Sequence, residues 1–200
     1  MPLMNHEAGR DVLLEVSHVL DAFEIPFFAM QGTALGLHRD RGFVPHEQDI
    51  DLGVLAEHLI PKAMEVATDL LRRGYDVEVI QVPFTRPRTL VAWKQLRGHV
   101  VKVDIVGMVR WRNLRFTETL ARPYQDEPYA IVHEASTVEL WDKSIEVWGR
   151  RFNLPKEIEQ YLLCEYGPSW TTPKEDHVSR TRVYNFLQRE GIKLNYLERW

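Results

Sequence analysis

Two aspartates spaced two residues apart, Asp49 and Asp51, follow a stretch rich in small residues in this 200-residue chain. That stretch, 30–36, reads Met-Gln-Gly-Thr-Ala-Leu-Gly after an apolar run, which predicts a turn that opens a helix. Side chains two apart on a strand point to the same face, so Asp49 and Asp51 are expected to present both carboxylates together. Facing carboxylates beside a turn whose N–H groups can hold a phosphate suit Mg²⁺ and a nucleotide. The pattern therefore predicts metal-dependent phosphoryl chemistry.

A third acid, Asp104, lies within the Val-rich run 101–106. Aspartate is depleted inside strands, and a charge on a half-buried strand is costly unless it is paired or bound to a metal. If this strand lies beside the strand of Asp49 and Asp51, three carboxylates converge. Two Mg²⁺ ions held there would stabilise both the attacking and the leaving oxygen of a phosphoryl displacement. The alternative is structural: Asp49 ends a loop and Asp51 caps a turn.

Two basic residues are candidate contacts for a donor phosphate. Arg39 follows the small-residue turn, where a cation can neutralise a diphosphate; surface solvation is the alternative. Lys102 lies two residues from Asp104 and therefore faces the same way on the strand. It is expected either to contact a donor phosphate or to form a salt bridge with Asp104.

The surrounding pattern predicts an α+β fold with a mixed β-sheet flanked by helices and a small helical C-terminal part. We expect one domain over 1–200, with a core at about 7–110 and an extension at about 111–200. Long helices are predicted from helical spacing of apolar residues and from Gly or Pro stops, and strands from apolar alternation. The expected helices are 7–23, 33–38, 57–73, 155–166 and 180–189; the expected strands are 27–30, 50–54, 76–82, 89–96, 99–109 and 129–133, with a hairpin turn at Arg97-Gly98.

Composition limits the class of protein. A hydrophobic share of 44% in 200 residues allows one good core. The net charge of −4 argues against an extended nucleic-acid surface. No stretch approaches the roughly 20 apolar residues of a membrane span, and the first residues lack the apolar run of a signal peptide. The expectation is a soluble, cytoplasmic protein of undetermined oligomeric state.

Two blocks of the sequence resemble a known family. Gly32-Thr-Ala-Leu-Gly-Leu-His-Arg-Asp-Arg-Gly-Phe-Val-Pro45, followed by Asp49-Ile50-Asp51, resembles the LicD/fukutin-type phosphotransferases of the nucleotidyltransferase superfamily. The second block, 154–173, contains Leu-Pro, Tyr-Leu, Tyr-Gly-Pro-Ser-Trp and Thr-Pro and is similar to a second block of the family.

The resemblance implies a nucleotidyltransferase-like fold and Mg²⁺-dependent transfer of a phospho-substituent, such as phosphocholine or an alditol phosphate. The donor would be CDP-linked and the acceptor a glycan hydroxyl or a small molecule. Asp49 and Asp51 would bind metal, and Asp104 would complete the metal site or accept the acceptor's proton. Gly32 and Thr33 would hold the donor phosphates.

One departure from the family pattern lies directly before Asp49. Where the family commonly has Trp-Asp-Asp, this chain has His46, Glu47 and Gln48, so one acid is lost. Two other functions therefore stay open. One is a nucleotidyltransferase that moves NMP from an NTP to a small molecule, a protein or an RNA end. The other is a non-catalytic nucleotide-binding module, although the presence of all three aspartates argues against it.

Overall fold

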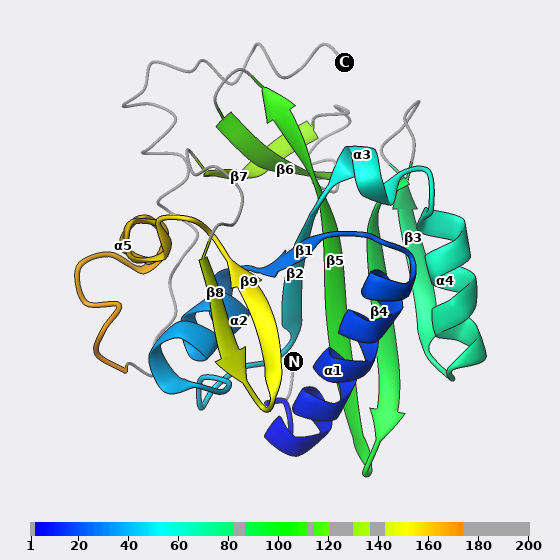
Figure 1. The fold of residues 1–200 in the computed structure, drawn as a ribbon, viewed down its shortest axis with the longest axis horizontal. Coiled ribbons are helices and arrows are strands. Elements are labelled where there is room, and N and C mark those ends of the chain that lie inside the picture. Colours follow the sequence, from blue (N-terminus) through cyan, green and yellow to red (C-terminus); the bar gives the residue numbers. More distant parts are fainter. Residues whose placement is uncertain (1–2, 82–86, 112–113, 121–129, 137–142, 174–200) are drawn as a thin grey trace, which may run out of the picture.

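A mixed β-sheet flanked by helices forms the centre of the structure, a computed structural model that describes residues 3–81, 87–111, 114–120, 130–136 and 143–173 (Figure 1). Its central strands, β2 and β5, run parallel, and the other strand pairs are antiparallel. The order across the sheet is β1-β2-β5-β4-β3, while β6 pairs with the end of β5 and β7 pairs with β6. This arrangement confirms the predicted α+β fold. The strands are β1 (Phe27–Ala29), β2 (Ile50–Leu55), β3 (Asp76–Gln81), β4 (Pro87–Leu96), β5 (His99–Trp111), β6 (Leu114–Leu120) and β7 (Ala130–Ser136).

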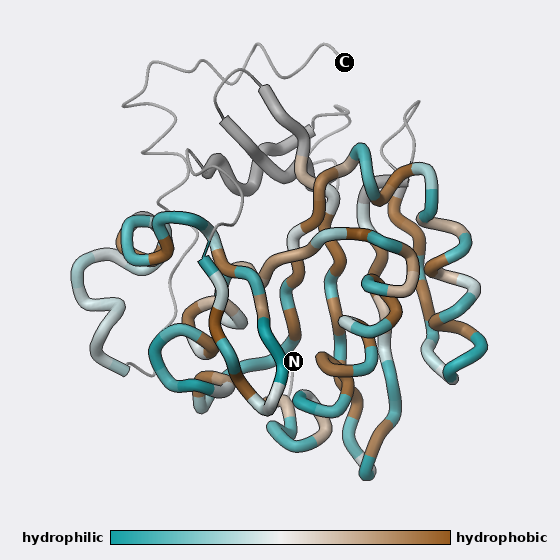
Figure 2. The backbone as a smooth tube through the Cα atoms, viewed as in Figure 1, coloured by the Kyte–Doolittle hydropathy of each residue, from teal (hydrophilic) through white to brown (hydrophobic). Residues whose placement is uncertain are grey.

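Two amphipathic helices, α1 (His6–Ala22) and α4 (Ala63–Arg72), cover one face of this sheet. The Asn5 side chain caps α1 by accepting a hydrogen bond from the Ala8 amide at 2.9 Å, a common way to satisfy the first turn of a helix. Hydrophobic and hydrophilic residues alternate along both helices (Figure 2), so that each turns an apolar face to the strands. Helix α1 packs against β5 and α4, and α4 packs against β3 and β4. These contacts hold the central strands in place.

The single helix predicted over 57–73 is wrong. The structure has a short helix α3 (Ala56–Leu59) and then α4, which starts at Ala63. Pro61 lies between them, and a proline has no N–H to continue the hydrogen-bond ladder of a helix. The end of the segment agrees with the prediction, since α4 finishes at Arg72 and Gly74 follows with a φ of 81°. Glycine is the residue that most readily adopts this backbone just past a helix end.

Two hairpins shape the sheet and its edge. Arg97 and Gly98 both have positive φ, the backbone that a two-residue hairpin turn requires, and they join β4 to β5 as predicted. A second hairpin, β8 (Lys143–Val147) and β9 (Arg150–Leu154), was not predicted. It packs beside β1, where the Asn153 side chain donates to the Phe27 carbonyl at 2.9 Å.

The helices near the candidate site are short. Helix α2 (Gln31–Leu35) runs directly into the π-helix η1 (Gly36–Asp40), which confirms and extends the helix predicted at 33–38. Helix α5 (Ile158–Tyr166) starts three residues later than predicted and stops, as expected, at Gly167. The helix predicted at 180–189 lies outside the described residues. No helix in the described part of the chain combines the length and the hydropathy that crossing a membrane requires.

Candidate active site

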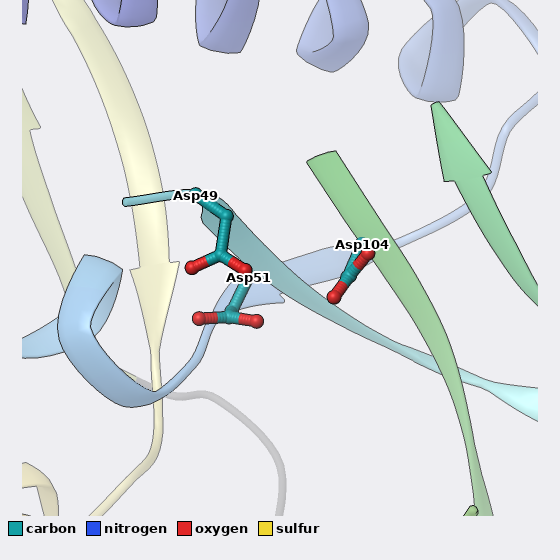
Figure 3. A group of neighbouring side chains, drawn as sticks. All are labelled: Asp49, Asp51 and Asp104. Carbon is teal, nitrogen blue, oxygen red and sulfur yellow. The ribbon is translucent and has the colours of Figure 1, made fainter. Parts of the chain in front are cut away.

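The three aspartates singled out from the sequence come together in the structure. Asp51 on β2 is the direct register partner of Asp104 on β5, and Asp49 lies just before β2. One carboxylate oxygen from each residue lies within 4.8 Å of the other two (Figure 3). The parallel pairing of β2 with β5 therefore produces the convergence that the sequence predicted on the condition that these strands are neighbours.

Lys102 lies among these acids. Its Nζ donates to Asp104 Oδ2 at 2.6 Å and to Asp49 Oδ2 at 3.2 Å. Burial opposes the charge of this ammonium, but the bonds to Asp104 and Asp49 outweigh it and raise the pKa of Lys102. Burial raises the pKa of Asp104, which Lys102 only partly offsets. Of the two alternatives for Lys102, the structure contains the salt bridge, and it includes Asp49 as well.

The donor set suits a divalent cation. Mg²⁺ takes hard oxygen ligands, and the described residues offer three carboxylates at one point. The second oxygen of Asp104, Oδ1, is buried and has no hydrogen-bond partner among the described residues. A buried carboxylate oxygen without a partner is costly in a folded protein, and coordination of a metal would remove that cost.

The small-residue turn is bound directly to the strand of acids. The Met30 amide donates to the Asp51 carbonyl at 3.0 Å, and the Asp51 amide donates to the buried Thr33 hydroxyl at 3.0 Å. Thr33 thus positions Asp51 relative to the turn. Its assignment, and that of Gly32, as contacts of donor phosphates stays a prediction.

A buried acid, Glu47, is a feature that the sequence indicated only as the acid retained beside Gln48, the position that loses one relative to the family pattern. Only 8% of Glu47 is exposed, and its carboxylate lies so close to Gly32 that a Cβ there would be 2.4 Å from Oε2. Burial, reinforced by the charge of Asp49, raises the pKa of Glu47 to about 7, because both effects disfavour the ionised carboxylate. Its place two residues before Asp49 was the one signal available in the sequence.

The C-terminal part of the described chain reaches the same turn. Gln31 has a φ of 45°, a strained value for a residue other than glycine. Its backbone N–H donates to the Tyr161 hydroxyl of α5 at 2.9 Å. Sequence reasoning missed this contact, because a tyrosine 130 residues away in sequence carries no local signal.

Arg39 is held by protein groups in this structure. Its guanidinium forms a two-point pair with Asp40 at 2.7 and 2.8 Å and donates to the Trp170 carbonyl at 2.9 Å. The His38 ring packs on Trp170 with centroids 5.7 Å apart. These contacts tie the end of η1 to the C-terminal segment, and a phosphate contact by Arg39 stays a prediction.

Comparison with known proteins identifies first the fold and then the family. The crystal structure of the lincosamide antibiotic adenylyltransferase LnuA, with lincomycin bound, superposes with a TM-score of 0.50 at 14% identity, over 94% of this chain and all of that one. A solution structure of the antibiotic-resistance factor ANT(2'')-Ia gives 0.48 at 14% identity, over 94% and 88% of the two chains. The likeness to LnuA shows a nucleotidyltransferase fold.

The family follows from the sequence match. Residues 24–158 match the LicD/FKTN/FKRP nucleotidyltransferase domain, and the chain belongs to this family. It is therefore a member of a transferase superfamily. The uncharacterized protein T07A5.1 of Caenorhabditis elegans is 27% identical over 179 residues, which cover 88% of this chain and 45% of that protein. The chain thus spans less than half the length of this relative.

Proposed function

We propose that this protein transfers a phospho-substituent, such as phosphocholine or an alditol phosphate, from a CDP-linked donor to a glycan hydroxyl, with Mg²⁺ as cofactor. The observation that carries the proposal is the meeting of Asp49, Asp51 and Asp104 on neighbouring strands, within 4.8 Å of one another, inside a LicD-family domain.

The three aspartates would hold Mg²⁺. The bound ion would neutralise charge on the phosphoryl oxygens and on the leaving diphosphate oxygen. Lys102 holds Asp49 and Asp104 in place through its two hydrogen bonds and adds a fixed positive charge beside them. Thr33 fixes the turn against Asp51, so that the backbone of the turn lies next to the acids.

The reaction forms one bond and breaks one. The acceptor oxygen bonds to the phosphorus that carries the transferred group, the bond from that phosphorus to the bridging oxygen breaks, and CMP leaves. The proton of the acceptor hydroxyl passes to solvent as the new bond forms, because one oxygen of Asp104 would ligate the metal and the other accepts from Lys102. Because the same acids would also serve nucleotidyl transfer, the identity of the nucleotide that binds distinguishes the two reactions.

A thermal-shift titration tests the proposal. CTP, CDP-choline and CDP-ribitol are each added with and without Mg²⁺ to the wild type, to Asp51→Asn and to Asp69→Asn. Asp69 is the control, because it pairs with Arg73 on the surface of α4. A ligand at 100 times its Kd stabilises by about 2.7 kcal/mol, which is about 5–10 °C in Tm for a chain of this size.

We expect a CDP-linked compound to stabilise the wild type and Asp69→Asn only when Mg²⁺ is present, and to leave Asp51→Asn unshifted. Stabilisation by CTP alone would indicate nucleotidyl transfer instead. A shift that persists in Asp51→Asn would contradict the assignment of the metal site.

A further inference from the structure

The chain itself supplies a positive charge at the proposed metal site, the ammonium of Lys102. The Lys102 ammonium bridges two of the three carboxylates, at 2.6 Å from Asp104 Oδ2 and 3.2 Å from Asp49 Oδ2. Its side chain is only 19% exposed. Solvent ions therefore screen these contacts weakly. The residues opposite on β4 are apolar at this level: Trp93 is the register partner of Lys102, and Val91 that of Asp104.

A pair of catalytic metal ions would compete with Lys102 for carboxylate oxygens. Two such ions lie about 3.5–4 Å apart and act on both oxygens of the displacement, so they must share ligands from one small set of carboxylates. Here one oxygen of Asp49 and one of Asp104 already accept from an ammonium. Lysine presents a compact positive charge. The charge of Lys102 repels a second dication held by the same carboxylates and supplies part of the stabilisation that such an ion would give.

The other oxygen of Asp104 is in a different situation. Oδ1 is buried and has no hydrogen-bond partner within the described ranges, so it can ligate a cation while Oδ2 keeps its bond to Lys102. Before a donor binds, the three carboxylates exceed the one ammonium by two negative charges, which a single divalent cation balances. The geometry and the charge both allow for one ion.

We propose that Lys102 takes the place of a second metal ion, so that the protein binds one divalent cation at Asp49, Asp51 and Asp104. This inference rests on the proposed function, and it replaces the two-ion arrangement that the sequence left open. In the proposed reaction, the positive charge that a second ion would supply beside the diphosphate comes from a side chain fixed to the metal ligands.

The test counts bound metal without measuring turnover. Mn²⁺ alone is titrated into the protein, and free Mn²⁺ is followed by its electron paramagnetic resonance signal. The variants are Lys102→Met, Lys102→Gln and, as a matched control, Lys94→Met. Lys94 is also a strand lysine paired with an acid, but its partner is Glu15 of α1, at 2.5 Å. Circular dichroism checks that each variant is folded.

We expect one Mn²⁺ per chain for the wild type and for Lys94→Met, and two for the folded Lys102 variants. Two ions in the wild type would overturn the inference while leaving the proposed function intact, and so would a single ion in the Lys102 variants. An absence of binding in the wild type, or equal binding by Asp51→Asn, would overturn the proposed function and this inference together.

Discussion

Replacement of Gly32 by alanine tests the contact between the small-residue turn and the buried acid Glu47. The added Cβ would lie 2.4 Å from Glu47 Oε2 and 2.8 Å from Oε1, whereas ordinary van der Waals contacts are 3.4–4 Å. The Glu47 carboxylate must therefore move away, in a site where only 8% of the residue is exposed. Overpacking of this kind costs about 1–3 kcal/mol, and each kcal/mol lowers Tm by about 2–4 °C at this chain length.

Two other glycines give reference values for the stability cost of Gly32→Ala. At Gly36 a Cβ would lie 2.5 Å from the Gly42 carbonyl oxygen. A backbone atom cannot rotate away, so Gly36→Ala is expected to cost about 3 kcal/mol or more. At Gly42 the nearest atom is 3.8 Å away, on Trp148. Gly42→Ala should therefore stay within about 0.5 kcal/mol of the wild type. Urea denaturation of the metal-free protein measures all three variants.

A double mutant separates the contact with Glu47 from a general effect of alanine. In a Glu47→Ala background, Gly32→Ala should cost at least about 1 kcal/mol less than it does alone, because the atoms that collide have been removed. Equal costs at Gly32 and Gly42, or no coupling between Gly32 and Glu47, would refute this explanation.

Two further variants probe the surroundings of the acids. The pKa of Glu47 is raised from 4.5 to about 7, so the wild type loses stability as pH rises through this window. Glu47→Gln should gain about 3 kcal/mol relative to it across that window in metal-free urea denaturation; a difference independent of pH would contradict this. Tyr161→Phe removes the acceptor of the Gln31 amide. The loss should cost about 1–2 kcal/mol and raise the donor KM more than it changes kcat. Tyr75→Phe, which loses only a bond to Glu15, should leave KM unchanged, and an equal KM effect in both variants would refute a positioning role for Tyr161.

The sequence predicted the elements whose signals are local. The apolar run around Asp104 indicated a strand whose acid needed a partner, and the structure pairs that strand with β2. The Arg97-Gly98 turn and the end of α4 near Gly74 follow from turn and helix-end signals in the sequence, and all three residues have positive φ in the structure. Such signals act within a few residues, so the local structure that they favour does not depend on tertiary contacts.

The missed elements had weaker or overlooked local signals. The break at Pro61 was visible in the sequence, but the helical spacing of the apolar residues on both sides concealed it. The β8–β9 hairpin alternates apolar and polar residues around Trp148 and Gly149, both with positive φ. An aromatic residue is a poor indicator of such a turn, which concealed the pattern.

The details of the site depend on tertiary geometry. The burial of Glu47 against Gly32, the reach of Lys102 to Asp49 and the contact of Tyr161 with Gln31 each join segments whose distance is set only by the completed fold. Residue types indicated what chemistry was available at Asp49, Asp51 and Asp104. Which further side chains surround these three aspartates could be known only from the structure.

The most direct test of the proposed reaction is the identity of the released product. Phosphorus NMR follows the wild type and Asp51→Asn with CDP-choline, CDP-ribitol or CTP in the presence of Mg²⁺, with water as the acceptor. We predict slow release of CMP from a CDP-linked compound by the wild type, no release after chelation of Mg²⁺, and none by Asp51→Asn. Pyrophosphate from CTP with no CMP from either CDP-linked compound, or undiminished CMP release by Asp51→Asn, would contradict the proposal.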